Sequence, residues 1–258
     1  MKSRISCVVM LAAALAAPPV FAQASAPAAA NNVDNAVDPA AVDALKAMGA
    51  YLHSLGRFSV STELTGESVL QDGQKLQHSA SAVLDVDRPH RLRAVMTGAG
   101  NKREIIVDGK TVTLYSPAQK YYSTVPFDGT LADLIGILRD KYGVELPLSD
   151  LFVWAAGEAR TDQFESALYA GREYIGTDPC DHYAFRQKGL DWQIWISAGA
   201  NPVPRKIVIT RRDDDARPQS VSILNWTSPP TFGDSAFRFQ PPAGAKRIDL
   251  APVAANKG

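Results

Sequence analysis

The sequence predicts an α+β protein that is mostly antiparallel β: a wide, curled sheet with an N-terminal helix and a helical insertion placed to cover its concave face. Three patterns support this prediction. Apolar residues alternate with a period of two along much of the chain, turn signals such as Asp108-Gly109 separate these runs, and only two regions have helical spacing. Successive strands without intervening helices exclude a doubly wound α/β fold. A sheet of about eleven strands is too wide to stay flat, so we expect it to curl.

The first structured element is expected to be a helix over about 38–55. Asp38 is a suitable N-cap, and Pro39 is favoured in a first helical turn. After them, Val42 and Leu45 begin an apolar stripe at helical spacing, which predicts one buried face.

Strands are predicted before and after a helical middle region. From Arg57 the apolar period changes to two, with Phe58 and Val60 on one face and serines between them. A last short strand is expected at Phe237 and Phe239. The other predicted strands are 57–65, a second one ending near 86, 91–97, 102–107, 110–115, 120–124, 167–176, 181–188, 191–197, 204–212 and 218–227.

The middle of the chain, about 129–166, has a different pattern. Its apolar residues at i, i+3, i+4 and i+7 are Leu131, Leu134, Ile135 and Leu138. They indicate an amphipathic helix. We expect a break at 143–147, a short helix through Leu151 and Trp154, and a helical turn near 161–166. A helical segment between two runs of strands is well placed to act as a lid on the concave face.

The first residues have the pattern of an export signal. Positive charges precede an apolar core that is too short to span a bilayer, and Val20-Phe21-Ala22 is a small-x-small cleavage site. We expect residues 1–22 to be removed, 23–37 to be a disordered leader, and 38–258 to form a single domain. The expected location is the periplasm, without a transmembrane segment.

Composition narrows the function. Lys and Arg together equal Asp and Glu in number, 27 each, so there is no basic field to attract nucleic acid. Removal of Cys7 with the signal leaves Cys180 alone, which excludes an internal disulfide and a zinc site built on several cysteines. Phosphate-binding glycine loops and zinc-protease or serine-hydrolase motifs are missing. We therefore expect neither a cofactor nor a metal, and no catalytic residues.

One local pattern keeps an enzymatic alternative open. Cys180 and His182 are two apart on a predicted strand, so they share a face and could act as nucleophile and base of a hydrolase. Side chains two apart on a strand are, however, about 7 Å from each other, which is longer than a hydrogen bond. The alternative interpretation is the polar face of an ordinary strand.

The curled sheet could enclose an apolar cavity, with the four lid residues above it. Candidate wall residues are Phe58, Val60, Leu64, Tyr115, Trp192, Ile194 and Ile196. Trp195 falls on the opposite face from Trp192 by strand alternation. A packed core without a cavity would use the same residue types, so both interpretations stay open.

Several segments in order carry a family resemblance. They are DVDRPHRLR (85–93), VDGKTVTLYSPAQKYY (107–122), LPLSDLF (146–152), YIGTDPCDHYAFRQ (174–187), DWQIWISAGANPVPRKIVIT (191–210) and FRFQPPAGAKRI (237–248). The chain resembles a family of predicted periplasmic bacterial proteins, DUF2092. That family is similar to the lipoprotein-localisation carriers and receptors (LolA/LolB-like) of the Gram-negative envelope. The resemblance implies a half-open barrel with a helical lid and a cavity for acyl chains or another hydrophobic ligand. No motif assigns the carrier's lid-contacting arginine to Arg57 or Arg93.

We therefore expect a monomeric, non-enzymatic periplasmic protein that holds a lipid, an acyl chain or a lipoprotein in the half-barrel, in envelope lipid or lipoprotein trafficking. A second hypothesis is an envelope-stress sensor or assembly factor that binds a protein partner. The hydrolase based on Cys180 and His182 is the third.

Overall fold

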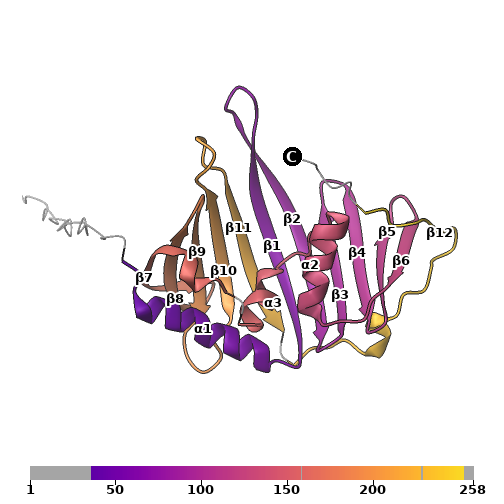
Figure 1. Ribbon diagram of the computed structural model, residues 1–258, viewed down its shortest axis with the longest axis horizontal. Helices are drawn as coiled ribbons and strands as arrows, with labels where there is room; N and C mark the ends of the chain where they lie inside the picture. Colours follow the sequence, from indigo (N-terminus) through magenta and orange to yellow (C-terminus); the bar gives the residue numbers. More distant parts are fainter. Residues whose placement is uncertain (1–35, 158, 228, 253–258) are drawn as a thin grey trace, which may run out of the picture. The chain divides into compact units, whose positions relative to one another are not determined.

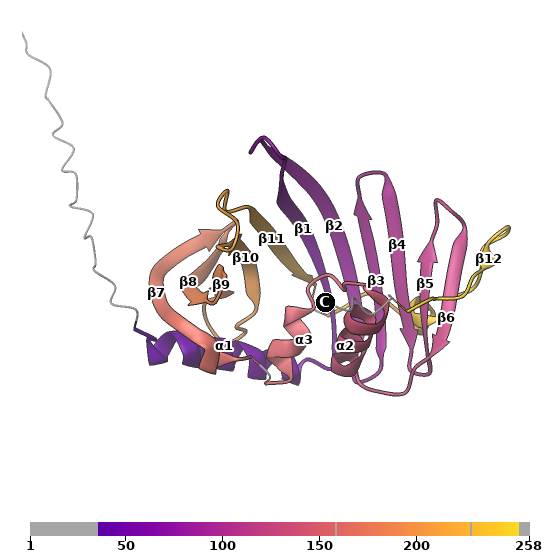
Figure 2. The ribbon, with the colours of Figure 1, turned by 45° about the horizontal axis from the view of Figure 1, so that its top comes forward.

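The computed structural model describes residues 36–157, 159–227 and 229–252, and all of them belong to one compact unit. Their strands form a single 12-stranded sheet in the order β12-β6-β5-β4-β3-β2-β1-β11-β10-β9-β8-β7. The pairs are antiparallel except for β12 with β6. The sheet curves, and Figure 2 shows β7, β8 and β9 curling over α1.

The strands come in two runs along the chain. The first run is β1 (Arg57–Val69), β2 (Lys75–Asp87), β3 (Arg91–Gly98), β4 (Asn101–Asp108), β5 (Thr111–Ser116) and β6 (Tyr121–Pro126). The second run is β7 (Phe164–Ile175), β8 (Asp178–Gln187), β9 (Leu190–Ser197), β10 (Pro204–Arg211) and β11 (Gln219–Thr227). The helices are α1 (Pro39–Ser54), α2 (Leu131–Tyr142) and α3 (Asp150–Ala155), with 3-10 turns η1 (Thr161–Gln163) and η2 (Asp234–Phe237). Figure 1 shows α2 and α3 in front of the first run and its junction with the second.

The two runs join where β1 pairs with β11, with Val60 opposite Trp226 and Leu64 opposite Ser222. The free edges are β7 at one side and β12 beside β6 at the other, so the described sheet is open. The prediction of a half-open, mostly antiparallel barrel with helices on one face is confirmed.

Strand alternation decides which face is covered. On β1, Phe58 and Val60 are buried and belong to the same hydrophobic cluster as the apolar faces of α1, α2 and α3. We call this side of the sheet the helix-covered face. Residues of the other parity point to the other side, which carries mostly polar side chains.

Helix α1 begins as predicted. Asp38 accepts a hydrogen bond from the backbone N–H of Ala40 (2.9 Å), and Pro39 occupies the first turn. Its buried face contains Leu45, Met48 and Gly49. The helix packs along α3 and reaches β7.

Helix α2 carries both kinds of terminal signal. Thr130 and Asp133 form a capping box at its start, and Gly143 ends it in the left-handed conformation at φ 62°. Its four predicted lid residues are all buried against the sheet. The expected insertion is therefore present as α2, α3 and the short turn η1.

The predicted strand at Phe237 and Phe239 is wrong. Phe237 ends the 3-10 turn η2 and is buried, with its ring perpendicular to that of Phe232. Phe239 packs on the rings of Tyr115 and Tyr122. These aromatic residues cover the outer side of the sheet through their side chains, so their burial needs no strand pairing. The last strand, β12, lies further on at Lys246–Arg247.

A β-bridge precedes the first helix. Val37 forms a parallel bridge with Ala167 on β7. The proposed signal peptide with its cysteine and most of the proposed leader lie outside the described residues. No helix in the described part of the chain is long and apolar enough to cross a membrane.

Candidate ligand-binding site

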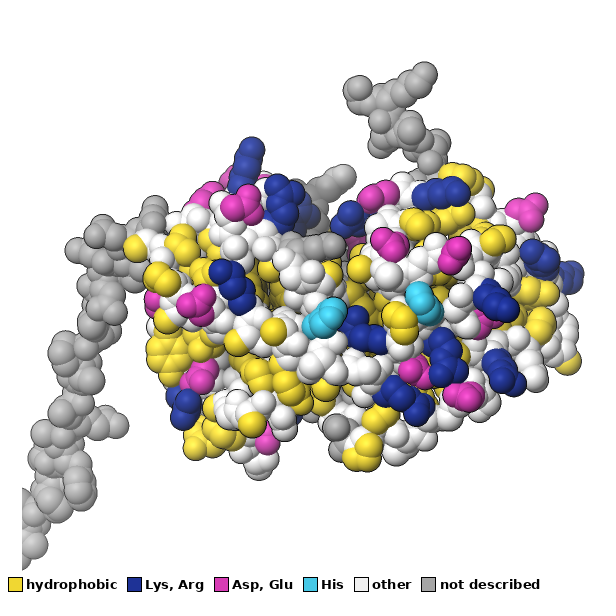
Figure 3. Space-filling model, turned by 60° about the horizontal axis from the view of Figure 1, so that its bottom comes forward, with side chains coloured by type: hydrophobic (Ala, Val, Ile, Leu, Met, Phe, Trp, Pro, Cys, Tyr) yellow, Lys and Arg dark blue, Asp and Glu magenta, His cyan; other side chains and the backbone are white. Residues whose placement is uncertain are grey.

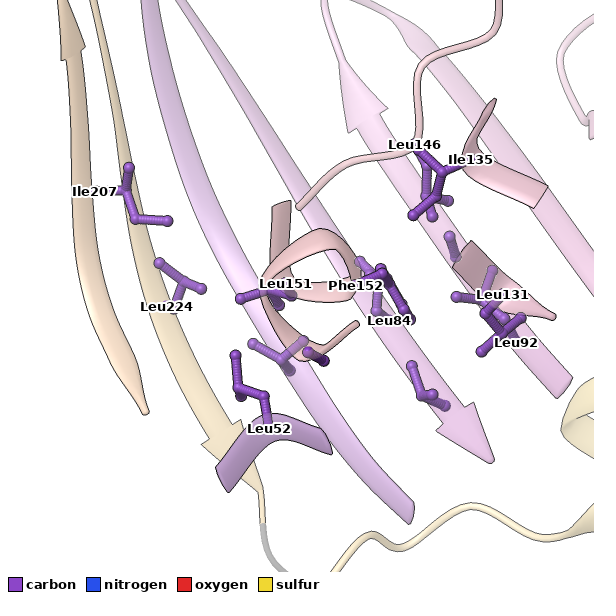
Figure 4. Close-up of a cluster of buried hydrophobic side chains, with 14 of the residues drawn as sticks. Leu52, Leu84, Leu92, Leu131, Ile135, Leu146, Leu151, Phe152, Ile207 and Leu224 are labelled. Atoms are coloured by element: carbon purple, nitrogen blue, oxygen red, sulfur yellow. The ribbon is translucent and has the colours of Figure 1, made fainter. Parts of the chain in front are cut away.

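The centre of the helix-covered face is filled by side chains. Figure 4 shows Leu131 of α2 next to Leu92 of β3, and Phe152 of α3 beside Leu84 of β2. All four are almost fully buried. At this point the helices pack on the sheet as a core does, without room for a ligand.

Open space remains on either side of this packed centre. Cavity A has a volume of about 620 Å³ and lies where β3–β6, the segment after α2 and the C-terminal segment meet. Cavity B has about 200 Å³ and is bordered by α1, α3 and β7–β10. Ligand pockets are typically about 300–1,000 Å³, so only cavity A has the volume of a ligand site.

Apolar side chains from separate elements form the wall of cavity A. Met96, Ile105 and Leu114 come from three strands, Val144 follows α2, and Leu250 belongs to the C-terminal segment. Of these, only Ile105 is fully buried; the others are partly exposed. Half-buried apolar residues around an empty volume are what a removable apolar ligand would cover.

The C-terminal segment closes one side of cavity A. Ile248 donates its backbone N–H to the carbonyl of Tyr122 (2.9 Å), and its own carbonyl accepts from the hydroxyl of Ser123 (2.7 Å). The Ile248 side chain stays 48% exposed. Backbone and side-chain hydrogen bonds therefore attach this wall to the edge strand β6.

Charged groups border cavity A as well. Glu104 forms ion pairs with Arg93 (3.0 Å) and Lys102 (3.3 Å). Arg103 and Glu145 are exposed at its border. The site therefore combines an apolar interior with ionised groups at its edge.

Cavity B is narrower and aromatic. The rings of Trp154 on α3 and Trp192 on β9 stack with centroids 6.0 Å apart, and Phe164 meets Trp192 edge-on. Asp150 of α3 borders the cavity, and desolvation by the surrounding protein raises the pKa of its carboxyl.

Arg88, which directly follows β2, has a guanidinium that is partly buried between aromatic rings. Its guanidinium lies 5.5 Å from the ring centroid of Phe152 and 5.9 Å from that of Phe58. Two of its nitrogens, Nε and one Nη, are buried without a hydrogen-bond partner, and desolvation lowers its pKa. Arg88 therefore contacts the helical insertion, whereas Arg57 and Arg93 pair with Asp87 and Glu104.

The structure brings most of the predicted site residues together, although as packed core. Ten of the eleven candidates lie on the helix-covered face: Phe58, Val60, Leu64, Leu131, Leu134, Ile135, Leu138, Trp192, Ile194 and Ile196. All of these except Leu64 are buried. Trp192 borders cavity B. Whether any of the ten binds a ligand stays a prediction.

Tyr115 is placed differently from the other candidates. It borders cavity A, but its ring packs on Phe239 at 5.3 Å on the outer side of the sheet. Its neighbour Leu114 instead pairs with Ile105 and faces the helices. Sequence reasoning missed Leu114, although the alternation of β5, with Val112 buried in the core, is the signal that identifies it.

Among the described residues, no hydrogen bond joins the side chains of Cys180 and His182. The Sγ of Cys180 is buried and donates to the carbonyl of Asp178, and desolvation raises its thiol pKa, which disfavours the thiolate. The His182 ring stacks on Trp195 at 3.9 Å, with its nitrogens next to Gln193 (3.0 Å) and Glu173 (3.3 Å). The interpretation as one face of an ordinary strand accounts for these contacts.

The described residues thus form an open antiparallel half-barrel with helices across one face and an apolar cavity beside them. The chain belongs to the family described as predicted periplasmic protein (DUF2092), whose model matches residues 41–251.

Solved structures with a related arrangement were also found. The lipoprotein LppX of Mycobacterium tuberculosis has 14% identity and a TM-score of 0.45, covering 75% of this chain and 98% of that one. LprF from Mycobacterium bovis has 16% identity and a TM-score of 0.44, covering 77% and 98%. A LolA superfamily protein from Nitrosomonas europaea has 11% identity and a TM-score of 0.31, covering 77% and 97%. No curated protein matches the sequence.

Proposed function

We propose that this protein is a periplasmic binding protein that holds a hydrophobic ligand, such as an acyl chain, in cavity A. The observation that carries the proposal is the cavity itself: about 620 Å³ of open space with an apolar wall, on the covered face of an open half-barrel. The family description of periplasmic proteins supports the location.

Binding here is driven by removal of apolar surface from water. Each methylene of a chain that enters the cavity contributes about 0.8 kcal/mol, so a chain of about ten carbons can offset the cost of association. The half-exposed side chains of Met96, Leu114 and Ile248 would become buried at the same time. The packed contacts of α2 with the sheet need not be broken for this site to fill.

Access to a larger ligand would involve the helical insertion. Arg88 leaves two nitrogens unpaired while Phe152 of α3 lies over it. Displacement of α3 would return these donors to water, which lowers the net cost of opening. The same proposal therefore accommodates a ligand that extends from cavity A toward the centre of the sheet.

Displacement of a neutral apolar dye tests the proposal. N-phenyl-1-naphthylamine should gain fluorescence on mixing with the protein, and 1-dodecanol below its solubility limit should displace it. Leu114→Trp puts a larger side chain into cavity A. We expect it to weaken dye binding by about tenfold, the equivalent of about 1.4 kcal/mol.

The matched control is Leu70→Trp, at an exposed position outside the residues that border cavity A. It should bind the dye like the unmodified protein. Absence of dye binding, or equal effects of the two substitutions, would rule out cavity A as the site.

A further inference from the structure

We infer that cavity A selects an amphiphile with an anionic head group, and that Arg103 binds that head group. The inference rests on the proposed function and adds the chemistry of the ligand's polar end. It comes from the position and the pairing of the charges at the cavity's border.

Strand alternation puts Arg103 on the same side as the apolar wall. On β4, Arg103, Ile105 and Val107 share the helix-covered face, where Ile105 and Val107 are buried. Arg103 lies opposite Met96 on β3. A cation thus stands at the end of a row of side chains that otherwise forms the apolar wall of the cavity.

The neighbouring cations on the same two strands already have partners. Lys102 and Arg93 point to the outer side and both pair with Glu104. Among the residues that the structure describes, Arg103 takes part in no ion pair and no side-chain hydrogen bond. Its five guanidinium donors are therefore available to a bound molecule.

The remaining anion at the border is Glu145, and it interacts with the end of α2. Arg139 has a raised pKa, chiefly through its hydrogen bond and ion pair with Asp140 and to a smaller extent through the charge of Glu145. No ion pair joins Glu145 to Arg103 in the described structure. A ligand anion would then meet a guanidinium that has no side-chain partner in the described structure.

Guanidinium geometry favours a particular class of head group. Arginine offers two parallel N–H donors that match a carboxylate or a phosphate, whereas a hydroxyl accepts at one point and an ammonium is repelled. With the chain in the apolar interior and the anion at Arg103, one molecule satisfies both parts of the site. Carboxylates and phosphate monoesters share this chemistry.

The test compares ligands that share a dodecyl chain and differ at the head. Dodecanoate, dodecyl phosphate, 1-dodecanol and dodecyltrimethylammonium, all below micellar concentration, displace N-phenyl-1-naphthylamine from the full chain. We expect at least one anion to bind about tenfold or more tightly than dodecanol, as a charge-assisted bond provides. The cation should bind most weakly.

The decisive variant is Arg103→Gln, and Lys102→Gln is its control on the same strand. Arg103→Gln should remove the preference for the anions and weaken their binding much more than that of dodecanol. Lys102→Gln removes a neighbouring cation that faces the other side and should alter neither. Because dodecanoate and dodecyl phosphate are tested separately, the order of their affinities shows which anion the site prefers.

The outcomes separate this inference from the proposed function. If dodecanol and both anions bind equally well in the unmodified protein, or if Arg103→Gln and Lys102→Gln have the same effect, the head-group inference is wrong and the apolar site stands. If none of the four ligands displaces the dye and the dye itself does not bind, the proposed function fails.

Discussion

Gly49 shows how a single residue sets the distance between two helices. It lies on the buried face of α1, and a methyl group added there would stand 2.5 Å from the carbonyl oxygen of Trp154 on α3. Backbone atoms cannot move aside as a flexible side chain can. The close packing of α1 on α3 therefore depends on the missing side chain at this position.

We predict that Gly49→Ala destabilises the protein, although alanine is the better helix former. The steric cost of overpacking is about 1–3 kcal/mol and exceeds the helix-propensity gain of about 1 kcal/mol. Gly136→Ala in α2 is the control, because its added methyl group meets nothing within 4 Å. Urea unfolding should show opposite signs for the two substitutions. A stabilised Gly49→Ala would show that α1 and α3 are not held this closely.

At the residue scale, the sequence predicts which face of a strand a side chain lies on better than it predicts what that side chain contacts. The alternation of β9 correctly assigns Trp192 and Trp195 to opposite faces, since a strand side chain has only two directions. It does not reveal that Trp195 is enclosed by His182 and by the ammonium of Lys206, 4.3 Å from its ring centroid. Those contacts depend on strand register, which one sequence does not fix.

Among the elements, α2 has the clearest terminal signal. The hydroxyl of Thr130 donates to the carboxylate of Asp133 (2.7 Å), which also accepts the Thr130 backbone N–H (2.8 Å). These bonds hold the pKa of Asp133 below its ordinary 3.8. A lowered folded-state pKa means that the stabilisation is present above pH 3.8 and is lost as the pH falls through the lowered value.

Thr130→Ala should therefore loosen α2. The loss of an N-cap costs about 1 kcal/mol, so hydrogen exchange of the α2 amides should accelerate about fivefold near neutral pH. The difference from the unmodified protein should shrink below pH 3.8. Ser149→Ala at the start of α3 is the control, since Ser149 makes no side-chain cap bond. Equal acceleration in both variants would contradict the role of the capping box.

The elements themselves were largely predictable, and the cavity was not. Long alternating runs and turn signals locate β1 to β11, because each signal is local. The two-residue β12 has no such pattern: Lys246 and Arg247 pair with β6 only because the tertiary fold brings them there. Cavity A depends on the same long-range approach of Ile248 and Leu250, so the candidate wall residues chosen from the sequence fell mainly in the packed core.

At the scale of the whole molecule, the described sheet is open, because its two end strands, β7 and β12, do not pair with each other. Among the described residues, the free side of β7 carries one bridge, between Ala167 and Val37, while the free side of β6 is paired with β12. Figure 3, with the α1 side forward, shows charges of both signs interspersed with hydrophobic side chains. Each edge strand is therefore covered by a short neighbouring segment, and β12 is the segment that covers β6.

We predict that a chain ending at Gly244 loses ligand binding and becomes prone to self-association. It lacks β12 together with Ile248 and Leu250, so the edge of β6 is uncovered and cavity A lacks a wall. A chain ending at Pro252 keeps all of these groups and is the control. Size-exclusion chromatography and dye titration check the two effects. Normal binding by the shorter chain would mean that cavity A is complete without its C-terminal wall.

The C-terminal wall of cavity A, at Ile248 and Leu250, comes late in the sequence. A polypeptide is synthesised from its N-terminus, so the residues of β1 to β6 are made before those near Ile248 that border cavity A. If the proposed function holds, a ligand can be retained only after this C-terminal segment has paired with β6, so the sheet can form before the site is complete.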